Sequence, residues 1–301
     1  MEFFFQQLTN GLTVGSIYAL IALGYTMVYG VLKLINFAHG DLFTIGAFLG
    51  LTLLTSLGLT NNIGTVAGVI VLAIMVVALV AIIGALLEKT AYRPLRQSNR
   101  LSAVVSALGA SIFFQNAIML IYGARVRVFP QNILPSTAVN IFGLDIPVVR
   151  IGVFICSLVM MAGLYLFIQK TKVGTAIRAA AIDQGAAKLM GINVDRVIMI
   201  VFMIGPALGG AAGLMVGLYY GKIDFTMGWI YGLKAFTAAI LGGIGNIPGA
   251  MLGGILLGVI EALGAAYIST AWKDGIAFLV LILILLIRPT GILGERVAEK
   301  V

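Results

Sequence analysis

The apolar residues of this chain gather into long blocks, and most of its polar residues lie in the intervals between them. Nine apolar blocks occupy residues 12–32, 42–57, 63–87, 101–122, 146–168, 197–220, 229–241, 250–268 and 276–287. Several approach or exceed the roughly 20 residues that a helix needs to cross the hydrocarbon core of a bilayer. The ten-residue alternation typical of outer-membrane barrels does not occur. The pattern predicts an all-α polytopic membrane protein, a single integral membrane domain with about eight or nine membrane-crossing or broken helices.

Two of these blocks, 42–57 and 229–241, are short and follow similar sequences. Tyr29-Gly30 precedes INFAHG at 35–40, and Tyr220-Gly221 precedes IDFTMG at 223–228. The later blocks follow in a shared order, which indicates an internal repeat with halves at about 12–87 and 197–268. Inverted halves with broken helices are typical of transporters and some channels. We expect the two copies to lie at opposite ends of the bundle, related by a pseudo-twofold axis in the membrane plane.

Composition excludes an ordinary soluble protein. The 301-residue chain is 61% hydrophobic and 10% charged, whereas soluble domains are about half apolar and about a quarter charged. Its net charge of +8 does not indicate nucleic acid, because the basic residues cluster between the apolar blocks. Thirteen lie in the intervals that begin at residues 33, 89, 170 and 288, against five in the alternate intervals. The positive-inside rule therefore places the interval 170–196 and the C-terminus in the cytoplasm and the N-terminus outside.

The interval 170–196 is the longest polar stretch between two apolar blocks, and it predicts a helix of its own. Gly174-Thr175 suits a helix start with Thr175 as N-cap, and Gly191 suits a C-cap. Arg178 and Lys188 lie off a stripe of small and apolar residues, which allows close approach by a partner. The stripe consists of Ala179, Ile182, Ala186 and Leu189. An amphipathic helix lying at the lipid headgroups has the same pattern.

Ionisable residues in or beside the apolar blocks are the candidates for chemistry, because charges inside a membrane are costly and often functional. His39 and Asp41 suit a proton relay or a substrate contact. The structural alternative is a helix start at Asn36 or Gly40, with His39 packed at the membrane interface. Glu261 suits a contact with a substrate ammonium group, a pair with a neighbouring helix, or a snorkelling carboxylate. One histidine and one cysteine form no metal cluster, and no serine lies in a nucleophile elbow, so an embedded enzyme is not expected.

Three segments carry a family resemblance. They are INFAHGD at 35–41, the loop with Arg178-Ala179, Asp183 and Gly191, and the ending RPTGILG at 288–294. Together they resemble the branched-chain amino acid permeases of bacterial ABC importers, the LivH type, over essentially the whole chain. The loop keeps the outline of the E-A-A consensus of ABC importers without its glutamate. The resemblance implies a transport subunit that has no ATPase site of its own and binds no cofactor.

The resemblance further implies that the interval 170–196 holds a coupling helix, which docks into a cleft of an ATPase subunit. The expected coupling residues are Gly174, Arg178, Ala179, Ile182, Asp183, Ala186, Ala187, Leu189 and Gly191. The candidates for the translocation pathway are Asn36, Phe37, His39, Gly40, Asp41, Asp224, Phe225 and Glu261. The implied partners are a second homologous permease, two cytoplasmic ATPases and an extracytoplasmic binding protein for leucine, isoleucine or valine. The implied location is the bacterial cytoplasmic membrane.

Other functions remain open at this point. Related importers carry other small solutes such as urea, short amides or sugars, and inverted repeats with short helices also serve passive channels and secondary carriers. A membrane scaffold is a third reading. A carrier needs buried ionisable groups for coupling, and the candidates reduce to His39, Asp41, Asp224 and Glu261. This scarcity favours the ATP-driven permease, and neighbouring genes for ATPases and a secreted binding protein would decide.

Overall fold

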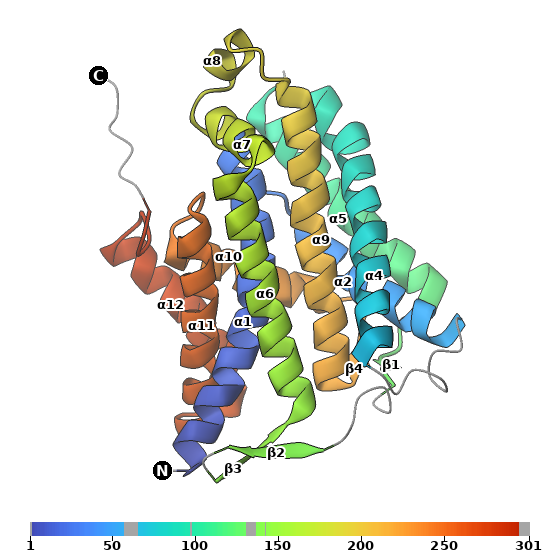
Figure 1. The fold of residues 1–301 in the computed structure, drawn as a ribbon, viewed down its shortest axis with the longest axis vertical. Coiled ribbons are helices and arrows are strands. Elements are labelled where there is room, and N and C mark those ends of the chain that lie inside the picture. The colour runs from blue at the N-terminus through green and yellow to red at the C-terminus, as the bar shows by residue number, and fades with distance from the viewer. Residues whose placement is uncertain (1, 57–65, 97, 131–136, 142, 295–301) are drawn as a thin grey trace.

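The computed structural model describes residues 2–56, 66–96, 98–130, 137–141 and 143–294, which form a bundle of long helices (Figure 1). The longer helices are α1 (Glu2–Leu32), α2 (His39–Ser56), α4 (Val66–Leu87), α5 (Arg100–Tyr122), α6 (Val148–Lys170), α7 (Lys172–Ile182), α9 (Val194–Tyr220), α10 (Met227–Gly242), α11 (Ile247–Tyr267) and α12 (Lys273–Ile287). The shorter ones are the π-helix η1 (Glu88–Tyr92), the 3-10 helices η2 (Arg93–Leu95) and η3 (Thr270–Trp272), and α8 (Gln184–Leu189). Two small antiparallel pairs join β1 (Arg127–Val128) to β4 (Lys222–Ile223) and β2 (Ala138–Ile141) to β3 (Leu144–Pro147).

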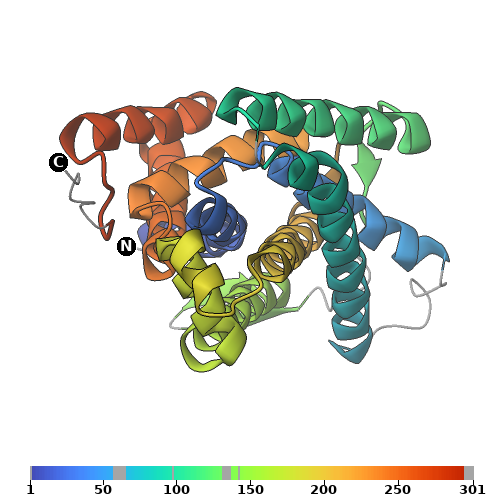
Figure 2. The ribbon, with the colours of Figure 1, turned by 90° about the horizontal axis from the view of Figure 1, so that it is seen from above.

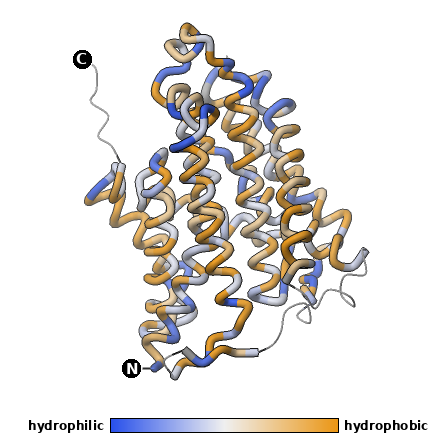
Figure 3. Tube along the Cα trace, in the orientation of Figure 1, coloured by the Kyte–Doolittle hydropathy of each residue, from blue (hydrophilic) through white to orange (hydrophobic). Residues whose placement is uncertain are grey.

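The predicted all-α polytopic fold is confirmed, since each apolar block coincides with a helix. Among the described residues, seven helical segments are long and apolar enough to cross a membrane, and α2 and α10 are the two short helices that the sequence indicated. The predicted block limits at 57 and 63 fall outside the described residues. Hydrophilic positions gather toward the ends of the bundle, and the helix shafts are largely hydrophobic (Figure 3).

Two of the spans, α1 and α9, lie at the centre of the bundle. α1 and α9 are buried along most of their length, whereas α5 and α12 expose most of theirs. Figure 2 shows α1 and α9 end-on within the bundle, with α5 and α12 along one edge. The central helices α1 and α9 are rich in small residues, which allow neighbouring helices to pack closely against them.

Small residues let the central helices approach closely. A Cβ atom on Gly258 of α11 would overlap the backbone of Gly15 on α1, and one on Gly254 would overlap the backbone of Ala19. These residues are spaced by four on each helix, so they form one seam of small-xxx-small type. The many glycines of the chain therefore serve close helix packing here.

The packing follows the order of the repeat. α1 packs along α11 as α9 packs along α4, and α2 packs on α9 as α10 packs on α1. The outer helices match as well, because α5 lies on α2 and α12 lies on α10. Exchanging α1 with α9, α2 with α10, α4 with α11 and α5 with α12 thus preserves the main contacts. Superposition of the two halves stays a prediction, and the contacts suggest that it should include α5 and α12.

Candidate functional site

The interval 170–196 projects from the end of the bundle opposite to the N-terminus (Figure 1). It holds two helices, α7 and α8, where the sequence predicted one helix beginning at Gly174-Thr175. The N-cap is Thr171, whose hydroxyl accepts a hydrogen bond from the backbone N–H of Gly174 at 2.9 Å. The start of the helix was therefore predicted four residues too late, because Thr175 repeats the same residue type one turn further on.

Asp183 interrupts the predicted helix. Its carboxylate accepts hydrogen bonds from the backbone N–H groups of Gly185 at 2.7 Å and Ala186 at 3.0 Å. An acceptor in this position caps a new helix, so α8 begins at Gln184. The predicted stop at Gly191 is confirmed, since this residue follows α8 with a φ of 81°.

An exposed apolar face extends over the end of α7 and along α8. Ile182, Leu189 and Met190 are 88%, 89% and 83% exposed, and Ala186 beside them is exposed too. Ala179 departs from the predicted stripe because it packs partly buried against the core. Large apolar side chains that gather on a surface outside the spanning helices indicate a surface that a partner covers. We call Ile182, Ala186, Leu189 and Met190 the loop face.

Other predicted coupling residues shape the loop instead of facing outward. A side chain on Gly174 would overlap the backbone of Ile168, so glycine permits the tight turn from α6 into α7. Arg178 donates from Nη1 to the carbonyl oxygen of Ile168 at 2.5 Å, which satisfies the end of α6. Ala187 is buried. Of these residues, only Ala179 was expected on the stripe, and a role in ATPase coupling for Gly174, Arg178, Ala179 and Ala187 stays a prediction.

The two copies of the repeated sequence form the same turn. Oδ1 of Asn36 accepts a hydrogen bond from the backbone N–H of Ala38 at 3.1 Å, and Oδ1 of Asp224 accepts one from Thr226 at 2.8 Å. Helices α2 and α10 begin three residues after Asn36 and Asp224. The local geometry of Asn36 therefore agrees with the structural alternative, in which this residue starts a helix.

The beginnings of α2 and α10 meet inside the protein. A Cβ atom on Gly40 would overlap the carbonyl oxygen of Gly228, and one on Gly228 would overlap that of Gly40. That Asn36 and Asp224 themselves lie at opposite ends of the bundle stays a prediction, whereas the helix starts that follow them meet. Unpaired N–H groups at a helix start are costly in lipid, so both short helices begin where protein surrounds them.

His39 and Asp41 hold the start of α2 in place. His39 is fully buried, which fits the packing role of the structural alternative, and its position at the membrane interface stays a prediction. Its Nε2 lies 3.1 Å from the carbonyl oxygen of Ile21, and its ring centroid lies 4.6 Å from that of Tyr25. Asp41 accepts a hydrogen bond from the hydroxyl of Ser111 at 2.5 Å. These contacts tie α2 to α1 and α5.

Phe37 and Phe225 precede the two short helices at equivalent places of the repeat. Both pack partly buried against the hydrophobic core. Their contacts are those of packing residues, and a role in translocation for either of them stays a prediction.

Glu261 lies in a buried cluster of charges. Its Oε1 lies 3.0 Å from Nζ of Lys234, 3.1 Å from Nζ of Lys273 and 3.1 Å from the hydroxyl of Tyr18. Lys234 also contacts Oδ1 of Asp274 at 2.6 Å. Glu261 is 1% exposed, so it is an interior carboxylate paired with neighbouring helices, and snorkelling is excluded. Sequence reasoning missed Lys234 as its partner, although a lysine inside an apolar block was a visible signal.

A second charge cluster lies next to the interval 170–196. Arg96 pairs with the buried Glu88 of η1, and it also contacts Oδ1 of Asp195 at 2.6 Å. Arg93 adds a longer contact with Asp195 at 3.7 Å. Tyr92 donates from its hydroxyl to Oδ1 of Asn36 at 2.8 Å. Sequence reasoning missed this cluster, because Arg93 and Arg96 were counted only as orientation signals and Asp195 lies in a separate interval.

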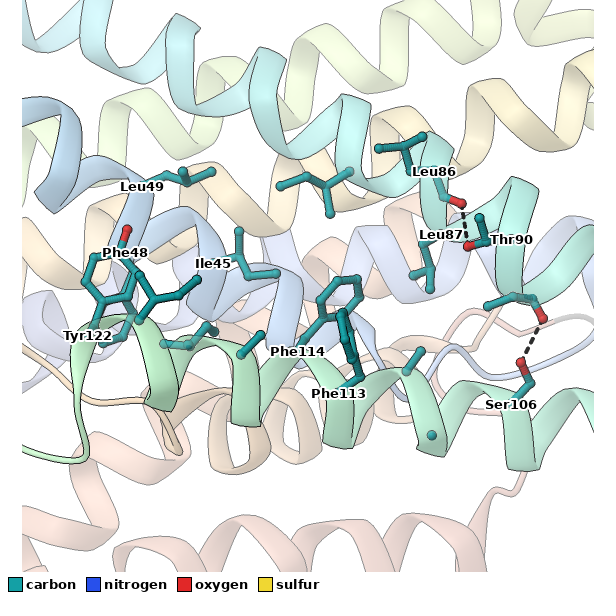
Figure 4. Close-up of a pocket in the computed structure, with 17 residues that line it drawn as sticks. Ile45, Phe48, Leu49, Leu86, Leu87, Thr90, Ser106, Phe113, Phe114 and Tyr122 are labelled. Atoms are coloured by element: carbon teal, nitrogen blue, oxygen red, sulfur yellow. Dashed lines mark hydrogen bonds between the residues drawn. The ribbon is translucent and has the colours of Figure 1, made fainter.

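A cavity of about 770 Å³ opens between α2, α4 and α5 (Figure 4). Phe113 and Phe114 of α5 contribute to its wall. Its hydroxyl groups are already satisfied, since Thr90 donates to Leu86 at 2.8 Å and Ser106 donates to Ala91 at 2.8 Å. An apolar wall with satisfied polar groups suits a lipid chain or an apolar side chain. It offers no free hydrogen-bond partner or opposite charge to a zwitterionic ligand.

Comparisons with known proteins agree on one family. The family model described as the permease component of branched-chain amino acid transport systems matches residues 7–285. The high-affinity branched-chain amino acid transport system permease protein BraD of Pseudomonas aeruginosa is 47% identical over 99% of this chain and 98% of its own length. The permease protein LivH of Escherichia coli K12 is 45% identical over 99% and 98%. A probable LivH of Methanocaldococcus jannaschii is 28% identical over 95% and 91%. No solved structure matches the chain.

Proposed function

We propose a role for this chain from the premise that it belongs to the family of branched-chain amino acid transport permeases. It is a membrane-spanning subunit of an ATP-driven importer for leucine, isoleucine and valine. It forms the translocation pathway together with a second homologous permease. Two cytoplasmic ATPase subunits bind and hydrolyse ATP, and an extracytoplasmic binding protein delivers the substrate. This chain supplies no catalytic site of its own.

The observation that carries the proposal is the loop face. Ile182, Leu189 and Met190 are large apolar residues that are more than 80% exposed on a loop outside the spanning helices. Such side chains gain about 1.5 to 3 kcal/mol each when they are fully buried. A passive channel or a secondary carrier has no need of this surface. A cytoplasmic ATPase that docks there would bury the loop face and contact the permease through it.

Orientation follows from charge and geometry together. The interval 170–196 lies opposite to the N-terminus of α1 and holds five Lys and Arg residues. We assign this end to the cytoplasm of a bacterial cell, with the N-terminus outside and the C-terminus inside. The ATPases and the binding protein then meet the permease at opposite ends.

The translocation pathway is assigned to the region around the two broken helices. Short helices that begin inside a bundle after a break are typical of transporter sites at the membrane midplane. Asn36, Gly40 and Asp224 lie at these two beginnings. Alternating access would result when ATP-driven movement of the loop face shifts one half of the repeat against the other.

The test separates the importer from a channel. The complex is isolated through an affinity tag on this chain and reconstituted into liposomes with its binding protein. Uptake of labelled leucine should require ATP on the ATPase side, and urea and sugars should not compete with it. Uptake that is unchanged without ATP would identify a channel or a carrier, and competition by another solute class would correct the substrate.

Ala186→Trp is the matching variant, because it adds bulk at the centre of the loop face. Overpacking costs about 1 to 3 kcal/mol, which corresponds to about fivefold to more than a hundredfold weaker docking. ATPase co-purification and ATP-driven uptake should fall together while the permease still inserts. Val126→Trp is the control, since Val126 is exposed at 59% outside the loop. Full uptake by Ala186→Trp at normal protein level would contradict the docking assignment.

A further inference from the structure

The chain is unwound between α1 and α2, and the backbone groups of this segment have few hydrogen-bond partners. α1 ends at Leu32, and Lys33 follows with a φ of 55°, the left-handed conformation that terminates helices. Residues 34–38 then run without regular structure to the start of α2. The last carbonyl groups of a helix have no partner within that helix. Side chains from elsewhere are therefore needed to hold this segment.

The first of these side chains comes from the interval 170–196. Gln184, the residue between Asp183 and the rest of α8, donates from Nε2 to the carbonyl oxygen of Val31 at 2.8 Å. Val31 is buried in the last turn of α1. Gln184 thus connects α8, which carries Ala186 and Leu189 of the loop face, to the end of α1, immediately before the break.

The second connection leaves from the other end of the same interval. Asp195, in the first turn of α9, binds Arg96 at 2.6 Å, and Arg96 pairs with the buried Glu88. Glu88 begins the π-helix η1, and Tyr92 at its end donates to Asn36 at 2.8 Å. Asn36 lies in the unwound segment and forms the turn that starts α2. A π-helical turn within a helix often marks a functional site, and here it joins the ion pairs to the break.

The two connections converge on the same segment and leave space between them. A cavity of about 130 Å³ is lined by Leu32, Leu34, Tyr92, Arg96, Ala103 and Gln184. Packed interiors have few voids of this size. The segment is therefore held at two points by directional bonds, with room to move between them.

We propose that Gln184 and Asp195 are positioning residues for energy coupling. When the ATPase moves the loop face, Gln184 pulls on the end of α1 while Asp195 acts through Arg96, η1 and Tyr92 on Asn36. The result is a shift of the segment 33–38 and of the start of α2, which meets the start of α10 at Gly40 and Gly228. This inference rests on the proposed function, because it assumes that an ATPase moves the loop.

The test uses the reconstituted complex and the variant Gln184→Leu, which removes the donor at similar size. Leucine transported per ATP hydrolysed should fall about fivefold, the effect of losing one hydrogen bond of about 1 kcal/mol. ATPase co-purification should stay normal, because Gln184 is not on the loop face. Gln184→Glu should fail like Gln184→Leu, while Gln184→Lys, which keeps a donor, should retain coupling. Gln6→Leu is the control, at an exposed position near the N-terminus.

A double-variant cycle asks whether the two connections act on one segment. Tyr92→Phe removes the hydroxyl that holds Asn36. Combined with Gln184→Leu, its effect on transport per ATP should differ from the product of the single effects by about threefold or more, because both act on one element. Combined with Gln6→Leu, the effects should simply multiply. If the effects on transport per ATP multiplied in both pairs, the two connections would not act on one segment, and this part of the proposal would be overturned.

A second measurement needs no ATPase. Leu34→Cys, in a permease whose Cys156 is replaced by Ser, should react faster with a maleimide when Gln184→Leu is added, because the segment is released. Equal rates would overturn the link. Normal transport per ATP in Gln184→Leu would also overturn it, and so would loss of ATPase co-purification, which would make Gln184 part of docking. Absence of ATP-dependent uptake in the wild-type complex would instead refute the proposed function.

Discussion

Glu261→Gln is expected to destabilise the permease more than it changes the handling of substrate. The carboxylate is 1% exposed, and its Oε1 faces Lys234, Lys273 and Tyr18. Breaking a buried ion pair by removing one partner costs about 3 to 5 kcal/mol. Two features reduce that cost here, since Asp274 remains as a partner for Lys234 and Lys273 is 37% exposed. We therefore expect a loss of about 2 to 3 kcal/mol.

The assay is thermal unfolding of the purified permease in detergent. A chain of this length loses about 2 °C in Tm per kcal/mol, so Tm should fall by about 4 to 6 °C. Glu2→Gln is the matched control, because Glu2 is exposed and should leave Tm unchanged. Replacing both partners, as Glu261→Leu with Lys234→Met, should cost less than the sum of the single replacements, since apolar residues then fill the site.

Two outcomes would refute this reasoning. If Glu261→Gln lowered Tm by less than about 1 °C, the cluster would be hydrated and the buried-pair argument would fail. If the variant kept its Tm and raised the KM for leucine, Glu261 would contact the substrate ammonium group, as the alternative reading of the sequence held. If Tm and KM were both unchanged, Glu261 would have neither the structural role nor the substrate contact.

Two further predictions concern orientation and the meeting of the breaks. In a Cys156→Ser background, Thr175→Cys should resist and Val126→Cys should accept a membrane-impermeant maleimide applied to intact spheroplasts, because the interval 170–196 is assigned to the cytoplasm; the reverse pattern would invert the topology. Gly228→Val should abolish or greatly reduce the yield of folded permease, because its side chain would meet the backbone of Gly40 and no rotamer relieves that overlap. Gly163→Val is the control for this variant, since no atom lies within 4 Å of a Cβ placed there, and equal yields would refute the close contact.

The fold was largely predictable from the sequence, because apolar length alone determines which segments span a bilayer. All nine helices of the apolar blocks were identified, and the two short ones were recognised. The residues at which helices begin and end were harder to predict where polar residues interrupt the pattern. Thr171 and Thr175 are both suitable N-caps, and only the position of the last turn of α6 selects the first. Asp183 reads as one more polar residue on a helix until its side chain is seen to cap α8.

The site was less predictable, because its contacts join residues far apart in the chain. Lys234 and Glu261 were each visible as unusual charges, but their pairing depends on how α10 and α11 pack. The contact of Gln184 with Val31 spans 153 positions and has no local signature. The repeat was visible as similar sequence, yet its meeting point at Gly40 and Gly228 required the crossing of two short helices.

The two charge clusters show where the symmetry of the repeat is broken. Glu88, the first residue of η1 after α4, and Glu261, within α11, lie in the corresponding helical segments after α2 and α10, and each is buried against basic residues. Around Glu261, the partners are Lys234, Lys273 and Tyr18, so that cluster closes on helices α1, α10 and α12. Around Glu88, Arg96 reaches out to Asp195 at the end of the interval 170–196. The same buried carboxylate thus serves packing in one half and faces the projecting loop in the other. In the proposed mechanism, this asymmetry would direct the movement of the loop to the cluster around Glu88 and leave the cluster around Glu261 as a fixed packing site.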